Sequence, residues 1–480
     1  MKKRPDMDQA LADLEARPAG AVVKPLVERA RGALAAIADA DQNRTDELVT
    51  ALAWSLYRPD RAEALAKLAV EDTGLGNVKD KIIKNQRKTF GTLRDLLRAK
   101  TVGVIEEDSA RGIVKFAKPV GVVAAVTPST NPSATAVNKA MMALKGRNAV
   151  IVAPSPTGFT TTSATVTAMR NELARIDAPP DLVQVLPPPP SKDATQSLME
   201  AVDLVVVTGS QDNVRRAYRS GTPAIGVGAG NVPVIIDETA DLDDVARKIA
   251  ASKTFDNATS CSSENALVIV GSIYREAVAA LQRAGGYMCK GDAVPRIRSL
   301  LWRGRTLNRQ LIAKDASVLA QAFALPDEAA GARFFMVEEN GYGPEHPFSG
   351  EKLSVVLAVY RAADFEDAIG IVRHILDYQG RGHSCGIHTR DSSRPSRLAQ
   401  SLDVVRVLVN FAHTFGNGGG FDSGLNFTLS MGCGTWQKNS ISENLNYRHF
   451  LNITHLVRPI SEDRPTEEVL FGPYWAKYGR

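Results

Sequence analysis

Apolar residues are spaced in two different ways along the chain. Between about residues 20 and 100 they recur every three or four positions, as in VKPLVERARGALAAI, which predicts amphipathic helices. Further on, short unbroken apolar runs alternate with helical stretches. The runs cover residues 120–126, 149–152, 182–185, 204–207 and 232–236. Because strands buried on both faces are apolar throughout, this alternation predicts a parallel sheet covered by helices on each side.

A second alternating region spans roughly residues 227–430. Its apolar runs cover residues 266–270, 353–360, 384–389 and 405–410. Ahead of the first sheet, two β-prone runs at 101–105 and 112–116 flank the polar stretch EEDSAR, which predicts a hairpin. With 480 residues the chain is too long for one hydrophobic core. We therefore expect an α/β protein with two sheet-based domains and a small β element.

Composition and charge exclude several classes of protein. The net charge of +5 is small for this length and argues against a nucleic-acid binder. No run of 18 apolar residues predicts a membrane span, and the N-terminus lacks the apolar core of a secretory signal. The four cysteines form no CxxC pair, so we expect neither a metal site nor a disulfide framework. These features favour the reducing cytoplasm.

Two residues are candidates for covalent chemistry. Cys261 lies among small polar residues in FDNATSCSSEN, where a substrate can reach the sulfur, and a nearby cation or helix start would increase its thiolate fraction. Asn131 lies in the proline-flanked segment TPSTNPSAT, a rigid loop whose amide can donate to a developing oxyanion. The residues alone leave two alternatives open: an inert loop cysteine, and an Asx-turn that stabilises its own loop.

Three further segments contain turn or anion-binding signals. Thr208, Gly209 and Ser210 follow an apolar run and precede a helical stretch, where backbone N–H groups favour an anion. Capping of that helix by Ser210 is the alternative. The stretch GVGAGN (226–231) departs from GxGxxG, no clear strand precedes it, and a strand follows it, so it does not predict a dinucleotide clamp. The stretch GNGGG (416–420) predicts a flexible loop.

Four long stretches resemble the aldehyde dehydrogenase superfamily, in particular its coenzyme-A-acylating branch. They are KPVGVVAAVTPSTNP (118–132), SGTPAIGVGAGNVPVIIDETADL (220–242), SKTFDNATSCSSE (252–264) and GCGTWQKNSISENL (432–445). The resemblance implies a Rossmann-type cofactor domain of residues 1–103 and 118–226 and an α/β catalytic domain of residues 227–431. It also implies a small β oligomerisation arm and tail, formed by residues 104–117 and 446–480.

The resemblance implies a role for each matching position. Cys261 matches the nucleophile that forms a thiohemiacetal and then an acyl-enzyme, and Asn131 matches the amide of the oxyanion hole. Glu351, in GEKLS, matches the glutamate that orients the nicotinamide ribose. The other positions implied to bind or line the cofactor are Thr127, Pro128, Ser129, Ser155, Thr157, Thr208, Gly209, Ser210 and Val227.

Two departures from the family pattern bear on the chemistry. Hydrolytic members have a glutamate general base where this chain has Val227, so the acyl group is expected to pass to coenzyme A, whose thiol needs less base assistance than water. A hydrolytic enzyme with Glu264 as its base and a non-catalytic nucleotide-binding relative are the alternatives. Ser155 replaces the lysine or histidine of many relatives. The sequence leaves the choice of cofactor between NADP and NAD open. NADP is favoured, because the small hydroxyl side chains of Ser155 and Thr157 leave room for the 2′-phosphate of its adenine ribose.

Two stretches, DTGLGNVKDKIIKN (72–85) and HTFGNGGGFDSGLNFTLSMGCGTW (413–436), resemble members that act on sulfoacetaldehyde. A sulfonate needs hydrogen-bond donors, for which Arg381, His383 and His413 are candidates, each with a purely local hydrogen bond as the alternative. Acetaldehyde, glycolaldehyde and succinate semialdehyde are the alternative substrates. Aromatic residues at the C-terminus, including Tyr474 and Trp475, predict packing on another subunit of a homodimer or homotetramer.

Overall fold

The computed structural model describes residues 18–480, so residues 1–17 of the predicted cofactor domain lie outside the described residues. The first sheet has five strands in the order β5-β4-β3-β6-β7, all paired in parallel. Its strands are β3 (Val122–Val126), β4 (Ala149–Ala153), β5 (Val183–Val185), β6 (Leu204–Val207) and β7 (Ala224–Gly226). Four of them fall on the predicted apolar runs. The fifth, β7, corrects the sequence interpretation, because a short strand does precede GVGAGN.

Helices cover this sheet on both faces, as the buried pattern of its strands requires. Every residue of β3, β4 and β6 is buried, and their side chains belong to one continuous hydrophobic core. The helices of this part are α2 (Pro18–Ala36), α3 (Gln42–Tyr57), α4 (Pro59–Thr73), α5 (Val78–Leu97), α6 (Pro132–Lys145), α7 (Phe159–Arg175), α8 (Lys192–Ala201) and α9 (Gln211–Arg219). The chain returns to the same core near its end through Leu445 and Phe450.

A second parallel sheet has seven strands in the order β10-β13-β14-β9-β8-β15-β16 and its own core. Its strands are β8 (Val232–Ile236), β9 (Glu264–Val270), β10 (Gly286–Cys289), β13 (Phe334–Glu338), β14 (Val356–Ala362), β15 (Gly382–His388) and β16 (Val404–Val409). Its helices are α10 (Leu242–Thr254), α11 (Tyr274–Arg283), α12 (Ala293–Leu301), α13 (Ala316–Ala322), α14 (Phe365–Tyr378), α15 (Arg394–Ser401) and α16 (His413–Gly416). A two-stranded ribbon is formed by β11 (Trp302–Arg303) and β12 (Thr306–Leu307).

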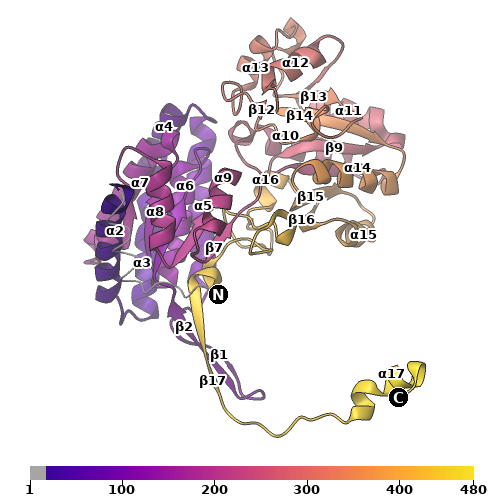
Figure 1. Cartoon of the computed structure of the whole chain (residues 1–480). Coiled ribbons are helices and arrows are strands. Elements are labelled where there is room, and N and C mark those ends of the chain that lie inside the picture. The colour runs from indigo at the N-terminus through magenta and orange to yellow at the C-terminus, as the bar shows by residue number, and fades with distance from the viewer. Residues whose placement is uncertain (1–17) are drawn as a thin grey trace.

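The two parallel sheets form separate lobes (Figure 1). The α/β fold with two sheet units is as the sequence predicted, while the domain boundaries themselves stay a prediction.

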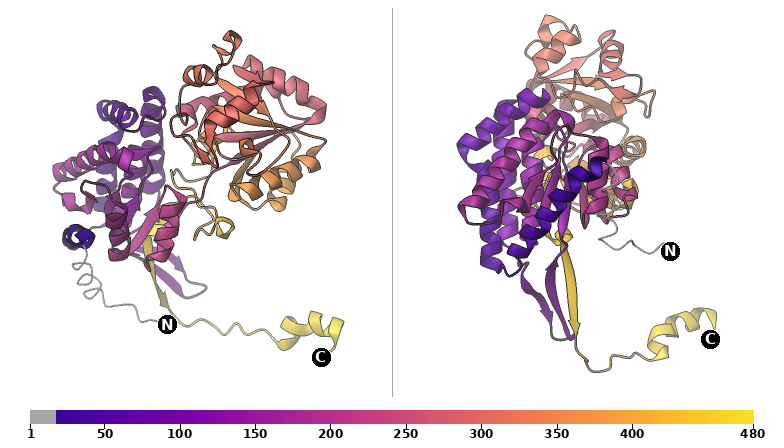
Figure 2. Two further views of the ribbon diagram at one scale, coloured as in Figure 1. Left: turned by 45° about the horizontal axis from the view of Figure 1, so that its top comes forward. Right: turned by 60° about the vertical axis from the view of Figure 1, so that its left-hand side comes forward.

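A three-stranded antiparallel sheet extends away from the two lobes (Figures 1 and 2). The predicted hairpin is present as β1 (Gly103–Asp108) and β2 (Ile113–Pro119), and β17 (Leu451–Val457) pairs with β2 along its whole length. Beyond β17 the chain reaches outward to α17 (Glu467–Tyr478). No helix within residues 18–480 is long and apolar enough to cross a membrane.

Candidate active site

The loops that follow three parallel strands meet at one large cavity. The segments after β3, β4 and β6 line it together with the loop that precedes β9, and its volume is about 1110 Å³. In open α/β sheets the carboxyl ends of the strands lie at one edge, which is where ligands bind. The volume is at the upper end of the ~300–1,000 Å³ typical of small-molecule sites. The cavity therefore has room for more than one small reactant.

Cys261 faces this cavity, whereas the other three cysteines are buried in the protein interior. It follows the short 3-10 helix η3 (Phe255–Ala258), in which Asp256, Asn257 and Ala258 have left-handed φ angles of 49°, 52° and 58°. Such angles cost roughly 1–3 kcal/mol each for a non-glycine residue and persist only where contacts enforce them. The nucleophile loop is thus held in one shape by its surroundings.

The glycine-rich loop 226–231 lies directly against Cys261. A Cβ atom on Gly230 would lie 2.5 Å from the Cys261 Cβ, so any side chain at this position would push the nucleophile out of place. The side chain of Gln437 fixes the loop by accepting from the Ala229 N–H at 2.9 Å and donating to the Ala229 carbonyl at 3.0 Å. The loop therefore forms a close packing surface against Cys261.

The surroundings of Cys261 oppose ionisation of its thiol more than they favour it. Burial raises its pKa to about 12, and the carboxylate of Glu351 adds to the shift. The buried guanidinium of Arg406 acts in the opposite direction but does not outweigh burial. At neutral pH the Cys261 thiol form is therefore favoured over the thiolate.

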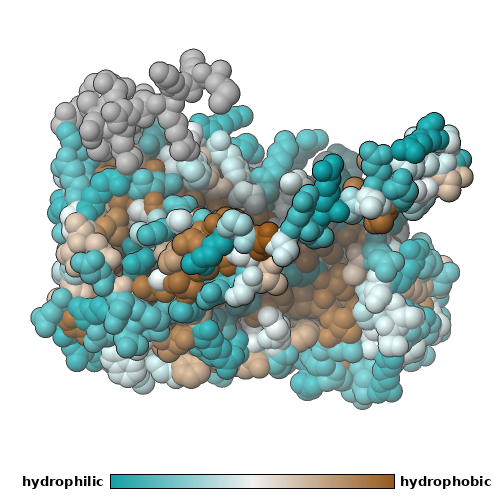
Figure 3. All heavy atoms as spheres, turned by 90° about the horizontal axis from the view of Figure 1, so that it is seen from below, coloured by the Kyte–Doolittle hydropathy of each residue, from teal (hydrophilic) through white to brown (hydrophobic). Residues whose placement is uncertain are grey.

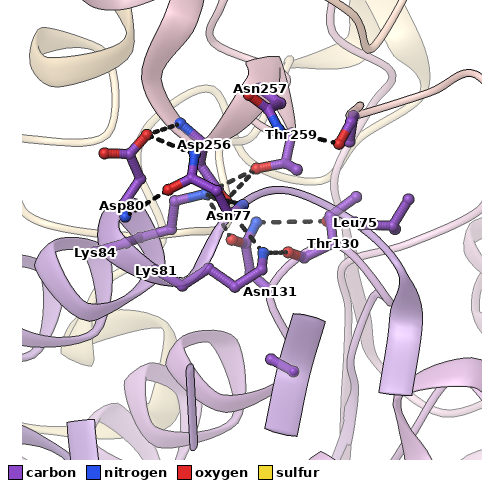
Figure 4. A network of polar contacts seen from close by, with 12 residues as sticks. Leu75, Asn77, Asp80, Lys81, Lys84, Thr130, Asn131, Asp256, Asn257 and Thr259 are labelled. Atoms are coloured by element: carbon purple, nitrogen blue, oxygen red, sulfur yellow. Dashed lines mark hydrogen bonds and ion pairs between the residues drawn. The ribbon is translucent and has the colours of Figure 1, made fainter. Parts of the chain in front are cut away.

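A buried ion network holds Asn131 opposite the nucleophile loop (Figure 4). Asn131 occupies the N-cap position of α6 but makes no capping hydrogen bond, which excludes the helix-capping role. Its Oδ1 instead accepts from Lys84 Nζ at 2.9 Å. Because an ammonium group only donates, the amide oxygen must face Lys84, and the Nδ2 group is left to donate elsewhere. Its one hydrogen bond in the described residues is a long contact of 3.4 Å to Thr130 Oγ1.

The same network reaches the nucleophile loop through Asp256. Lys84 donates to the Asp256 carboxylate and, at 2.8 Å, to Thr259 Oγ1, two residues before Cys261. Lys81 donates to the same carboxylate at 3.1 Å and to the Thr130 carbonyl at 3.1 Å. Burial disfavours ionisation of Asp256, but the two lysines outweigh it and lower the pKa of this carboxyl. Helix α5 thus ties Asn131 to the loop that carries Cys261.

Every residue predicted to bind the cofactor lines the cavity. These are Thr127, Pro128, Ser129, Ser155, Thr157, Thr208, Gly209, Ser210, Val227 and Glu351. Ser210 also caps α9 by accepting from the Asn213 N–H at 3.3 Å, so the capping alternative is correct and coexists with a place in the cavity wall. The buried hydroxyls of Thr127 and Ser155 have no hydrogen-bond partner within residues 18–480 and are available to a ligand.

Two glutamates near the site have different surroundings. Glu351 lines the cavity, and burial raises its pKa to about 7 despite the opposing charges of Lys253 and Lys352. Glu264, the alternative general base, is fully buried at the start of β9 and does not line the cavity. Its carboxylate accepts from Ser252 Oγ at 2.6 Å. Glu264 therefore has no access to a water in the cavity.

The three residues predicted to bind a sulfonate lie away from the cavity wall. Arg381 is exposed and donates to Asp403 at 3.0 Å. His383 and His413 are buried, and burial lowers the pKa of each imidazole, to about 4 for His413. His413 Nδ1 lies 3.0 Å from the Ser262 carbonyl oxygen, so a local hydrogen bond explains its position.

Sequence reasoning missed several residues that the fold brings into the cavity. They include the cations Arg87, Lys88 and Lys192, and the aromatic side chain of Phe415. Arg87 and Lys88 come from the middle of α5, where the periodic pattern marks surface positions and gives no sign of a cavity. Lys192 begins α8, beyond the proline run 187–190. The loop 416–420, predicted to be flexible, is buried against α5, with Lys88 Nζ donating to the Gly418 carbonyl at 2.7 Å.

A cysteine, a side-chain amide and a Rossmann-like sheet meet at one cavity, an arrangement that fits an oxidoreductase with covalent catalysis. Comparison with known proteins agrees. The model of the aldehyde dehydrogenase family matches residues 4–294. A sulfoacetaldehyde dehydrogenase (acylating) from Cupriavidus necator is 50% identical over 99% of this chain and 97% of its own length. A second sulfoacetaldehyde dehydrogenase (acylating), from Bilophila wadsworthia, is 42% identical over 95% of this chain and 99% of its own length.

Solved structures give the same result. An acetylating aldehyde dehydrogenase from Geobacillus thermoglucosidasius superposes with a TM-score of 0.88 at 32% identity, over 96% of this chain and all of that one. The chain belongs to the aldehyde dehydrogenase family, and within it to the acylating branch.

Proposed function

We propose that the protein oxidises sulfoacetaldehyde with NAD(P)+ and coenzyme A to sulfoacetyl-CoA, through a thioester on Cys261. The observation that carries the acylating reaction is the makeup of the cavity: Cys261, Asn131 and Val227 line it, and the family resemblance matches Val227 to the general base of hydrolytic members. Glu264 cannot replace that base because it is buried behind the cavity wall. An acyl group on Cys261 therefore waits for a nucleophile that needs less help than water.

The residues act in a fixed order. The Cys261 thiolate attacks the carbonyl carbon, and the resulting oxyanion accepts a hydrogen bond from Asn131 Nδ2, which Lys84 turns toward the substrate. A bound NAD(P)+ supplies the acceptor for the hydride that leaves this carbon. The carbon is then a thioester. The thiol of coenzyme A adds to it and gives up its proton to solvent, and Cys261 leaves as a thiolate. One aldehyde and one coenzyme A thus yield one acyl-CoA, one reduced nucleotide and one proton.

The cavity fits a dinucleotide with its phosphates at the start of α9. Ser210 and Gly209 lie at this N-terminus, where backbone N–H groups favour anions. Ser155 and Thr127 add two hydroxyls without partners in the described chain. Lys192 also lines the cavity and lies 3.6 Å from Asp212. A cation in the wall of this cavity would favour NADP, whose extra phosphate is an anion.

Omitting coenzyme A tests the acylating reaction. Purified enzyme, sulfoacetaldehyde and NADP+ should form NADPH only up to about one equivalent per site without coenzyme A, and should turn over continuously when it is added. Equal turnover to free sulfoacetate without coenzyme A would contradict the proposal. Steady-state comparison of sulfoacetaldehyde with acetaldehyde, glycolaldehyde and succinate semialdehyde tests the substrate. A higher kcat/KM for any of the other three would refute the sulfonate assignment.

The C-terminal segment supports a homodimer or homotetramer. Its helix α17 exposes Val469, Leu470, Phe471, Tyr474 and Tyr478, each at least 49% accessible. The segment projects away from the two lobes in Figure 1, and the view from below in Figure 3 shows apolar residues, in brown, on the side from which it projects. Large apolar side chains gathered on a projecting helix mark an interaction surface, and we assign it to a second copy of this chain. Deleting residues 459–480 should reduce the size measured by sedimentation velocity. An unchanged size would show that α17 does not hold the oligomer together.

A cytoplasmic location follows from the chemistry, since all four cysteines are free and Cys261 must stay reduced to act. Fractionation of the native host tests it.

A further inference from the structure

Helix α5 presents three cations to the cavity from one face. Lys84, Arg87 and Lys88 are spaced by three and four residues, so their side chains lie side by side, and all three line the cavity. Lys84 is committed to the Asp256 carboxylate and to Asn131. Within residues 18–480, neither Arg87 nor Lys88 makes a hydrogen bond or ion pair with a carboxylate. Asp422 acts on Arg87 only through space, without a direct ion pair, so both side chains keep donors for a ligand.

The two cations are held by aromatic rings and a carbonyl. The Arg87 guanidinium lies 5.7, 5.2 and 5.8 Å from the ring centroids of Phe415, Phe421 and Phe427. Lys88 donates to the Gly418 carbonyl at 2.7 Å and lies 5.5 Å from the Phe427 ring. Rings attract a cation but do not neutralise it. Arg87 and Lys88 are thus held in place, partly shielded from solvent, and their remaining N–H donors could bind an anion.

Arg87 and Lys88 line the same cavity as Cys261. Burial, with smaller contributions from the charges of Arg87 and Lys84, lowers the pKa of Lys88 to about 7. A substrate whose carbonyl carbon bonds to Cys261 and whose acidic group lies one methylene away would bring that group to these donors.

We propose that Arg87 and Lys88 form the binding site for the sulfonate group of the substrate. This inference rests on the proposed function and names the residues that select its substrate. Arginine presents a planar fork of N–H donors that matches the oxygens of a sulfonate, and the lysine adds a point charge. Arg381, His383 and His413 do not line the cavity, and this pair takes the role that the sequence gave to them.

Substitutions on α5 test the site with a matched control. Arg87→Met and Lys88→Met remove one cation each and keep the length of the side chain. Arg94→Met is the control, because Arg94 also lies over Phe421 and Phe427, at 5.3 and 5.0 Å, but does not line the cavity. For each variant, kcat/KM is measured with sulfoacetaldehyde and with propionaldehyde, and their ratio is compared with that of the wild type.

Each cavity substitution should lower the ratio of the two kcat/KM values by about 10- to 100-fold, the range expected for a lost charge-assisted hydrogen bond. Arg94→Met should leave the ratio within about two-fold of wild type. A ratio that Arg87→Met and Lys88→Met do not change, or that Arg94→Met lowers equally, would overturn the assignment. A preference for neutral aldehydes in the wild type would instead refute the proposed substrate.

A second measurement keeps these two failures apart. Ethanesulfonate carries the acidic group without a reactive carbonyl, so it should inhibit propionaldehyde oxidation competitively in the wild type at pH 7. Arg87→Met should raise its inhibition constant by about 10-fold or more. This result would support the anion site even if sulfoacetaldehyde were a poor substrate. The absence of competitive inhibition in the wild type would overturn the site whatever the best aldehyde is.

Discussion

Replacing Lys84 by methionine should slow catalysis without removing any residue that touches the substrate. Lys84 Nζ donates to Asn131 Oδ1 at 2.9 Å and to Thr259 Oγ1 at 2.8 Å, and it also contacts the Asp256 carboxylate. Methionine fills similar space but donates nothing. The Asn131 amide would then lose the contact that turns its N–H group toward the substrate.

The size of the effect is bounded by two quantities. Losing an oxyanion donor outright costs about 10²- to 10³-fold in kcat, or ~2.7–4 kcal/mol, and this sets the upper limit for Lys84→Met. A freed amide still visits the correct orientation, so we expect a loss of about 10- to 100-fold. Folding should be less affected. Asp256 keeps Lys81 at 3.1 Å and Thr259 at 2.7 Å, so the free energy of unfolding should fall by only ~1.5–3 kcal/mol.

A double-mutant cycle separates positioning from general damage. Single-turnover formation of reduced nucleotide is measured for wild type, Lys84→Met, Asn131→Ala and the double variant, with thermal denaturation alongside. If Lys84 acts through Asn131, the double variant should be no slower than Asn131→Ala alone. Rate losses that multiply in the double variant would refute the reasoning, because they would mean that Lys84 acts on catalysis by an independent route.

Three further outcomes are expected. Gly76→Ala should lower the melting temperature and kcat, because its Cβ would lie 1.9 Å from Asp256 Oδ1. Gly103→Ala is the control, with a similar positive φ but open space around it, and it should lower both quantities less. Equal losses in the two variants would exclude the clash as the cause. The kcat/KM for sulfoacetaldehyde should fall as pH rises through about 7, because Lys88 carries its charge only below that pKa, and Lys88→Met should remove this limb of the profile. Iodoacetamide labelling of Cys261 should keep accelerating from pH 7 to 10, because burial raises the thiol pKa to about 12; a plateau near neutral pH would contradict this.

The sequence alone determined the elements and the main chemistry. Strands β6 and β8 begin and end where the apolar runs do, since a strand buried on both faces must be apolar at every position. Cys261 and Asn131 were identified because they lie in long stretches that resemble the aldehyde dehydrogenase family. Val227 lies in another such stretch, where hydrolytic members have a glutamate, and it therefore pointed to an acylating reaction. Local pattern also predicted the hairpin of β1 and β2, whose partners are neighbours in the chain.

Only the tertiary structure decided what surrounds the nucleophile. Lys84, Arg87 and Lys88 precede Cys261 by more than 170 residues and read as an exposed helix face, yet packing of α5 against the nucleophile loop turns them into the cavity. The thiol pKa could not be predicted from the sequence either, because burial and the charge of Glu351 depend on the whole enclosure and not on the neighbours in sequence. Periodicity reports which face of an element is apolar; which polar side chains meet across a cavity is set by contacts between distant segments.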